Sequence, residues 1–85
     1  MGQIEKLKMR LLSMPKDFTA EELDKLMAGL GYIKLRPGKT TGSKIEYKDP
    51  ASGKDLVLHS PHPRKTFLPY AVQRIIRFLQ ETGRL

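Results

Sequence analysis

The spacing of apolar residues changes at Gly31, and this change limits the chain to a mixed fold of helices and strands. Before Gly31, apolar residues recur every three or four positions, as on a helix with one buried face. After it they alternate with polar residues, as in a half-buried sheet, and helical spacing returns after Pro69. This order predicts an α+β fold in one domain spanning residues 1–85.

Two helices are expected before the change in spacing. The first covers residues 3–13 and is ended by Pro15. The second begins after Thr19, which forms a capping box with Glu22, and continues to Gly31, a natural left-handed helix end. Their core-facing residues are expected to be Ile4, Leu7, Leu11, Leu12, Leu23, Leu26, Met27 and Leu30.

Three strands are expected next, over residues 32–36, 43–48 and 55–59. Ile33 and Leu35 alternate with polar residues in the first. The turn sequence DPASG predicts that the other two strands form an antiparallel hairpin. If the hairpin lays its apolar face on the helices, alternation brings three polar side chains to the opposite, open face: Lys44, Glu46 and His59.

A last helix is expected to open at Pro69 and to end at Gly83. Val72, Ile75, Ile76 and Leu79 form its apolar stripe, and Arg74 and Arg77 lie on its other face.

The net charge of +7 is concentrated after residue 31. Residues 1–31 contain five cations and five anions, whereas residues 32–85 contain eleven cations and four anions. A one-sided cationic surface on a small domain suits a polyanion such as RNA. The alternatives are a basic face that maintains solubility or that meets an acidic protein.

Composition excludes several other classes of protein. The chain has no cysteine, so it forms neither a disulfide nor a thiolate zinc site, and its two histidines lack the spacing of a metal motif. We therefore expect no metal and no cofactor. No apolar run is long enough to span a membrane, and the charged start MGQIEKLKMR is unlike a signal peptide, so we expect a cytoplasmic protein.

The segment LGYIKLRPGKTTGSKIEY, followed by a strand and by PHPRKTFLPYAVQRIIRFL, resembles the HicA family of bacterial toxins. These are small RNA-cleaving enzymes of toxin-antitoxin pairs, and their fold is similar to that of double-stranded-RNA-binding domains (dsRBDs). The resemblance implies a dsRBD-like core over residues 18–83: a three-stranded antiparallel sheet with helices packed on one face. Residues 1–14 would be an additional N-terminal helix. An mRNA target and a HicB-type antitoxin partner are implied as well.

The resemblance also bears on the catalytic residues. In this family a catalytic histidine follows a glycine-serine step and enters the second strand, and Lys44 occupies that place here. A second family histidine matches His62, while His59 is an additional histidine just before it.

Metal-independent RNA cleavage moves one proton from the 2′-hydroxyl and another to the leaving 5′ oxygen, beside a cation that stabilises the phosphate. Histidine suits proton transfer near neutral pH, whereas lysine, with an ordinary pKa of about 10.4, suits the phosphate. We therefore assign Lys44 to the phosphate and proton transfer to either His59 or His62. Strand alternation favours His59 and the resemblance favours His62. Asp55 and Glu46 would orient a histidine or lysine, or form a solvated ion pair.

Further residues around this face would contact the RNA backbone without reading its sequence. They are Lys34, Arg36, Lys39, Ser43, Lys48, Arg64 and Lys65. Arg74 and Arg77 would instead serve an antitoxin. The leading hypothesis is a metal-independent endoribonuclease of the HicA type. The alternatives are an inactive RNA-binding module of the same fold and a protein-interaction domain.

Overall fold

The computed structural model describes residues 2–35, 44–59 and 66–85. It contains the helices and strands in the order predicted from the sequence. The elements are α1 (Gln3–Leu12), α2 (Ala20–Gly29), β1 (Ile33–Leu35), β2 (Lys44–Lys48), β3 (Asp55–His59) and α3 (Pro69–Glu81).

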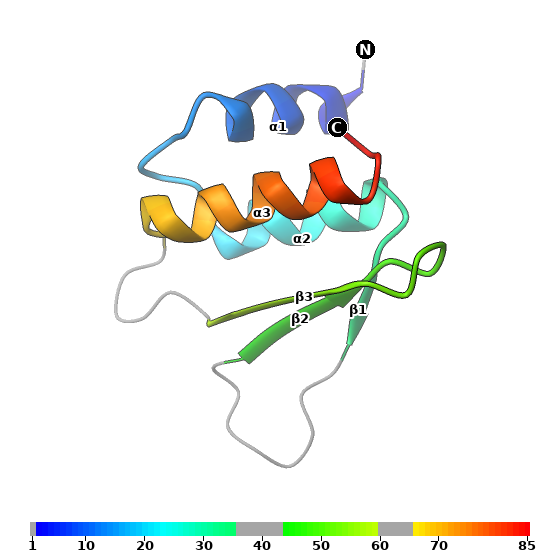
Figure 1. The fold of residues 1–85 in the computed structure, drawn as a ribbon. Coiled ribbons are helices and arrows are strands. Elements are labelled where there is room, and N and C mark those ends of the chain that lie inside the picture. Colours follow the sequence, from blue (N-terminus) through cyan, green and yellow to red (C-terminus); the bar gives the residue numbers. More distant parts are fainter. Residues whose placement is uncertain (1, 36–43, 60–65) are drawn as a thin grey trace.

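The strands form an antiparallel sheet in the order β1-β2-β3, and α2 and α3 both lie over the same face of this sheet (Figure 1). The α1 helix packs on α2 and α3 from the side away from the sheet. The two expected layers are therefore present, and α1 adds a third. The order α2-β1-β2-β3-α3 is the predicted dsRBD-like α+β arrangement, with an additional N-terminal helix.

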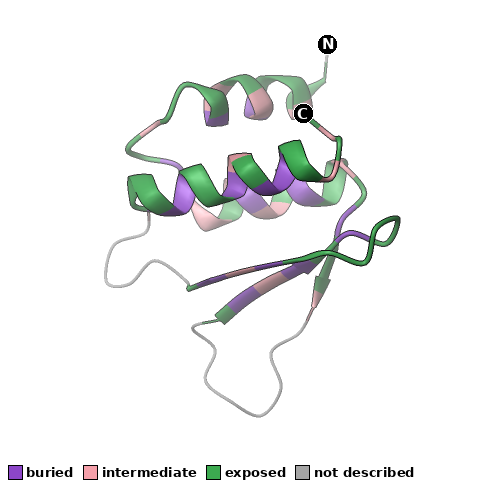
Figure 2. Ribbon diagram, in the orientation of Figure 1, coloured by how far each residue is buried: buried purple, intermediate pink, exposed green. Residues whose placement is uncertain are grey.

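The hydrophobic core lies between the sheet and the α2–α3 pair, and it extends between that pair and α1 (Figure 2). Burial of this apolar surface is the main stabilising contribution to the fold. The sheet contributes Ile45, Tyr47, Leu56 and Leu58, and the helices contribute Leu7, Leu11, Leu23, Leu26, Met27, Ala71, Val72, Ile75, Phe78 and Leu79.

The ends of α2 follow the predicted capping chemistry. The Thr19 hydroxyl accepts a hydrogen bond from the Glu22 backbone N–H at 3.1 Å, and the Glu22 carboxylate accepts one from the Thr19 N–H at 3.0 Å. Just beyond the other end, Gly31 has a φ of 92°, the left-handed conformation that glycine adopts without strain. Both predictions for α2 are confirmed.

The α1 helix is held by apolar contacts and by one arginine. Leu7 and Leu11 are buried against the rest of the core. The Arg10 guanidinium contacts the Glu22 carboxylate at 2.7 Å and the Asp17 carboxylate at 2.9 Å. The α1 helix approaches α2 so closely that a side chain at Gly29 would collide with that of Ile4, which would have to move.

The short strand β1 is oriented differently from what its two apolar residues suggest. Lys34 pairs with Tyr47 and therefore lies on the helix-facing side, while Ile33 and Leu35 lie on the open side. Ile33 is 50% exposed, whereas Tyr32, just before the strand, is buried against Phe78. Tyr32 thus takes the core position that the alternation pattern alone would give to Ile33.

Candidate functional site

The candidate site lies on the face of the sheet that is turned away from α1, α2 and α3, the helices of the described residues. In the β2–β3 pairing, Lys44 is directly opposite His59. Residues directly opposite in an antiparallel pair lie on the same face with neighbouring Cβ atoms, about 4.5–5.5 Å apart. Both residues are exposed. The structure therefore brings together the lysine and one of the two histidines that the sequence singled out.

Glu46 is the third polar residue at this place. It lies two residues beyond Lys44 on β2 and so shares the open face. Its Oε1 is 3.8 Å from the Lys44 ammonium, and 26% of its side chain is exposed, compared with 50% for Lys44. The predicted grouping of Lys44, Glu46 and His59 is thus observed in the geometry of the hairpin.

The open face also has an apolar part, to which alternation along β3 assigns Val57 and to which β1 adds residues that the sequence did not place there. Glu46 is opposite Val57 on one side and Leu35 on the other. Both neighbours are half-buried, and Ile33 beyond Leu35 is more exposed. Lys44 and His59, at the end of the hairpin away from its turn, therefore lie next to an apolar strip formed by Ile33, Leu35 and Val57. Only the register of β1 on β2 could have revealed this strip.

Two predicted RNA-contacting lysines have different positions. Lys48 is exposed on the open face, opposite Asp55. Lys34 lies on the other face, where its ammonium contacts the Asp24 carboxylate of α2 at 3.0 Å. Its expected place beside the open face is therefore corrected, because the strand alternation directs it toward α2.

Six of the predicted residues lie outside the described part of the chain. One is the candidate catalytic His62. The others were predicted to contact RNA: Arg36, Lys39, Ser43, Arg64 and Lys65.

The site is supported from below by a buried tyrosine. Tyr47 lies on β2 between Glu46 and Lys48 but points into the core, where it is 1% exposed. Its hydroxyl donates a hydrogen bond to the Asp24 carboxylate of α2. Burial, together with this carboxylate, raises the pKa of the Tyr47 hydroxyl. The strand that carries Lys44 and Glu46 is in this way attached to the helix layer.

The far end of the hairpin is fixed by a buried ion pair. Asp49, 1% exposed, accepts hydrogen bonds from the Arg84 guanidinium at 2.7 Å and from the Ser52 hydroxyl at 2.7 Å. The hydrogen bond from Arg84 is the main cause that lowers the pKa of Asp49 to about 2. The Arg84 guanidinium also lies 4.8 Å from the centre of the Tyr32 ring. The C-terminus thereby holds the turn that sets the register of β2 and β3.

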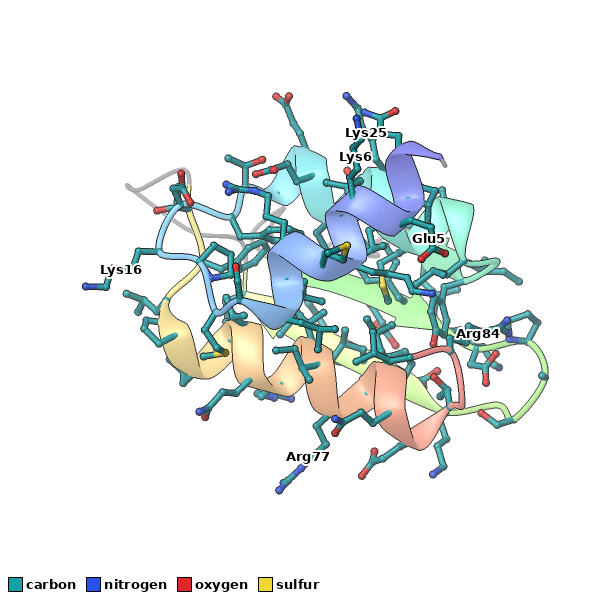
Figure 3. The ribbon with its side chains drawn as sticks, turned by 90° about the horizontal axis from the view of Figure 1, so that it is seen from above. Glu5, Lys6, Lys16, Lys25, Arg77 and Arg84 are labelled. Atoms are coloured by element: carbon teal, nitrogen blue, oxygen red, sulfur yellow. The ribbon has the colours of Figure 1, made fainter. Side chains whose placement is uncertain are left out.

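A second surface feature lies on α3. An open groove with a volume of about 670 Å³ runs along this helix and is lined by Met14, Tyr70, Gln73, Arg74, Ile76, Arg77 and Gln80. Arg77 points away from the rest of the molecule (Figure 3). Neither Arg74 nor Arg77 forms an ion pair with another described residue. Within the described part of the chain, no carboxylate therefore occupies either guanidinium group.

Within residues 2–35, 44–59 and 66–85, no three histidine, aspartate or glutamate side chains are grouped so that they could hold a metal ion. None of the helices in these ranges is long and apolar enough to cross a membrane.

The fold is a dsRBD-like α+β arrangement in which one face of the sheet is covered by none of the described helices. Comparison with protein families then identifies the chain further, because the model of the HicA toxin of bacterial toxin-antitoxin systems matches residues 20–83. The chain belongs to this HicA toxin family. The match begins after α1, so this helix is an addition to the family core. Comparison with curated protein sequences gave no match, and comparison with solved structures gave none either.

Proposed function

We propose that this protein is an RNA-cleaving toxin whose active site lies on the open face of the sheet. The observation that carries this proposal is the direct pairing of Lys44 with His59. It gives one face a cation suited to a phosphate and an imidazole suited to proton transfer. Membership of the HicA toxin family supports the same conclusion.

The reaction proceeds in one step at phosphorus. The 2′ oxygen of the RNA gives its proton to a general base and attacks the adjacent phosphorus, and the bond to the 5′ oxygen breaks. His59 gives a proton to the departing 5′ oxygen, and Lys44 stabilises the negative charge that accumulates on the phosphate. The products are a 2′,3′-cyclic phosphate and a free 5′-hydroxyl.

Expression of the toxin and its variants in cells tests this function. Wild-type protein is expected to arrest growth and to degrade mRNA when no antitoxin is present. His59→Ala and Lys44→Ala should each abolish both effects, while Lys34→Ala serves as the control because Lys34 pairs with Asp24 away from the site. Growth arrest that persists in His59→Ala but not in His62→Ala would transfer the proton-transfer role to His62.

An inactive RNA-binding module is the second candidate function. It is favoured by Lys44, because the resemblance to the HicA family places a catalytic histidine at this position and an ordinary lysine is a poor base. Binding of RNA by the wild-type protein without cleavage or growth arrest would establish this alternative and overturn the first.

We further propose that a HicB-type antitoxin neutralises the protein and that Arg74 and Arg77 contribute to its binding. These two arginines lie one turn apart and form no ion pair with another described residue, and Tyr70 and Met14 beside them are exposed. Such a surface suits an acidic segment with apolar side chains. Co-expression with the product of the neighbouring reading frame should rescue growth. The Arg74→Glu/Arg77→Glu variant should escape this rescue, whereas the control variant Lys25→Glu, changed on α2, should not.

A further inference from the structure

We propose that Glu46 is the general base of the cleavage reaction, with His59 as its general acid. This inference rests on the proposed ribonuclease function and names a catalytic residue for it. Cleavage needs two proton-transfer groups, one for the 2′-hydroxyl and one for the 5′ oxygen. Glu46 is the carboxylate that contacts Lys44, the cation proposed to hold the phosphate.

The register gives the three residues a triangular arrangement. Lys44 is directly opposite His59 across the hairpin, and it is two residues from Glu46 along β2, a separation of about 7 Å between Cα atoms. Glu46 and His59 are therefore diagonal neighbours, about 7–8 Å apart and within reach of one group bound between them. In-line attack requires the base and the acid on opposite sides of the phosphorus. A phosphate held by Lys44 between these two side chains meets that requirement.

The surroundings of Glu46 suit a reactive carboxylate better than a structural one. Its ion pair with Lys44 is long, at 3.8 Å, and both side chains are partly solvated, so the pair contributes little to stability. The flanking residues Leu35 and Val57 are apolar and half-buried. Across both neighbouring strands Glu46 therefore faces apolar side chains, and among the described residues the Lys44 ammonium is the only cation in contact with its carboxylate.

The charged groups on this face define the expected pH dependence. β2 contributes Lys44 and Lys48 beside Glu46, β3 contributes Asp55 and His59, and the described residues of β1 add no charge to the open side. A carboxylate base and an imidazolium acid give a bell-shaped dependence of rate on pH. The acidic limb reports protonation of the base, and the alkaline limb reports loss of the proton from the acid.

The decisive experiment compares Glu46→Gln and His59→Ala on two RNA oligonucleotides of the same sequence in buffer containing EDTA. One has an ordinary phosphodiester at the cleavage site, and the other has sulfur in place of the 5′ bridging oxygen. A thiolate leaves without being protonated, so the sulfur substrate needs the base but not the acid. We expect both variants to be slower by about 10²–10⁴-fold on the ordinary substrate. The sulfur substrate should restore His59→Ala and leave Glu46→Gln slow.

Binding and pH profiles separate a base from a residue that only positions Lys44. If Glu46 is the base, Glu46→Gln should bind RNA at least as tightly as wild type, because the substitution removes a negative charge near the phosphate. The acidic limb of the pH profile should disappear in this variant. A positioning role would instead weaken RNA binding and keep that limb. Glu81→Gln, which removes an exposed carboxylate at the end of α3 and away from the sheet, is the matched control and should retain rate and profile. Thermal unfolding of each variant checks that it is folded.

Two results would overturn the inference, and they can be told apart. In the first, the wild-type protein cleaves the ordinary substrate, and Glu46→Gln keeps both the wild-type rate and the acidic limb of the pH profile. The base would then be another group, and the ribonuclease function would stand. Wild-type protein that binds but leaves both substrates intact would overturn the ribonuclease function and the role of Glu46 together.

Discussion

At the scale of single residues, the site depends on groups that are buried on the other side of the hairpin. Lys44, Glu46 and His59 are presented to solvent, whereas Tyr47 and Asp49 fix the same strand through buried hydrogen bonds. A buried polar group that loses its partner costs more than the hydrogen bond itself contributes. The support of the site should therefore be measurable as stability, separately from activity.

Asp49 should make stability depend on acid pH. Its pKa is lowered in the folded protein from an ordinary value of 3.8 to about 2. A lowered folded-state pKa gives stability that is present above the unfolded value and is lost as the pH falls through the folded value. Wild-type protein should therefore lose thermal stability between about pH 4 and pH 2.

The Asp49→Asn variant checks this prediction by thermal unfolding followed by circular dichroism. At pH 7 its Tm should be lower than that of wild type by roughly 5–10 °C. The difference should shrink toward pH 2, because the wild-type carboxylate becomes protonated as the pH falls through its pKa of about 2. A difference that stays constant from pH 7 to pH 2 would contradict the assignment of the acid sensitivity to Asp49.

At the scale of elements, the register of the β2–β3 hairpin determines whether Lys44 and His59 meet. A slip of one residue would move His59 to the other face of the sheet. Because the natural chain has no cysteine, a crosslink can test the register directly. The double variant Lys44→Cys/His59→Cys should oxidise to an intramolecular disulfide, since residues directly opposite have Cα atoms within disulfide range.

The matched control for the crosslink is Lys44→Cys/Leu58→Cys, whose second position is buried on the helix-facing side. It should remain reduced under the same mild oxidant, as measured by thiol titration and intact mass. Efficient crosslinking of the control instead of the first variant would show that the hairpin is shifted by one residue.

The added helix α1 should contribute to the stability of the whole domain. Leu11, on the core-facing side of this helix, is 0% exposed, whereas Met9 on its outer side is 71% exposed. Leu11→Ala should lower the free energy of unfolding by about 2–5 kcal/mol, because it removes a buried side chain and leaves a cavity. Met9→Ala should change it by less than about 0.5 kcal/mol. Denaturant unfolding measures both, and equal small effects would mean that α1 is not part of the core.

Helices whose ends are marked by a capping residue, a glycine or a proline were predictable from the sequence. Thr19 with Glu22, Gly31 and Pro69 mark helix ends by local hydrogen bonding or backbone geometry, and the structure has them there. Alternation along β2 and β3 likewise predicted the shared face of Lys44 and His59.

The orientation of β1 could not be read from its own residues. Three residues leave the alternation ambiguous, and the choice is made by long-range contacts of Tyr32 with Phe78 and of Lys34 with Asp24. The same contacts place Leu35 beside Glu46, which has Val57 on its other side. Alternation along β2 already placed Glu46 on the open face, but its apolar neighbour on β1 appears only once the sheet is assembled.

At the scale of the whole molecule, the excess positive charge should act through the open face. If single-stranded RNA binds there, the logarithm of the affinity falls linearly with the logarithm of the salt concentration, with a slope of about −0.7 for each phosphate contacted. Lys48 lies exposed on this face, whereas Lys34 is paired with Asp24 on the other side.

Lys48→Ala should therefore reduce the magnitude of the salt slope by about 0.7, and Lys34→Ala should leave it unchanged. Fluorescence anisotropy of a labelled RNA at several salt concentrations measures both slopes. An equal effect of the two variants would mean that RNA does not distinguish the two faces of the sheet.

The most direct test of the account is the product formed by the purified wild-type protein from a single-stranded RNA oligonucleotide in buffer with EDTA. The pairing of Lys44 with His59 predicts cleavage that leaves a 2′,3′-cyclic phosphate and a 5′-hydroxyl, slowed by about 10²–10⁴-fold in His59→Ala. RNA that binds and stays intact, or that is cleaved only after Mg²⁺ is added, would contradict it.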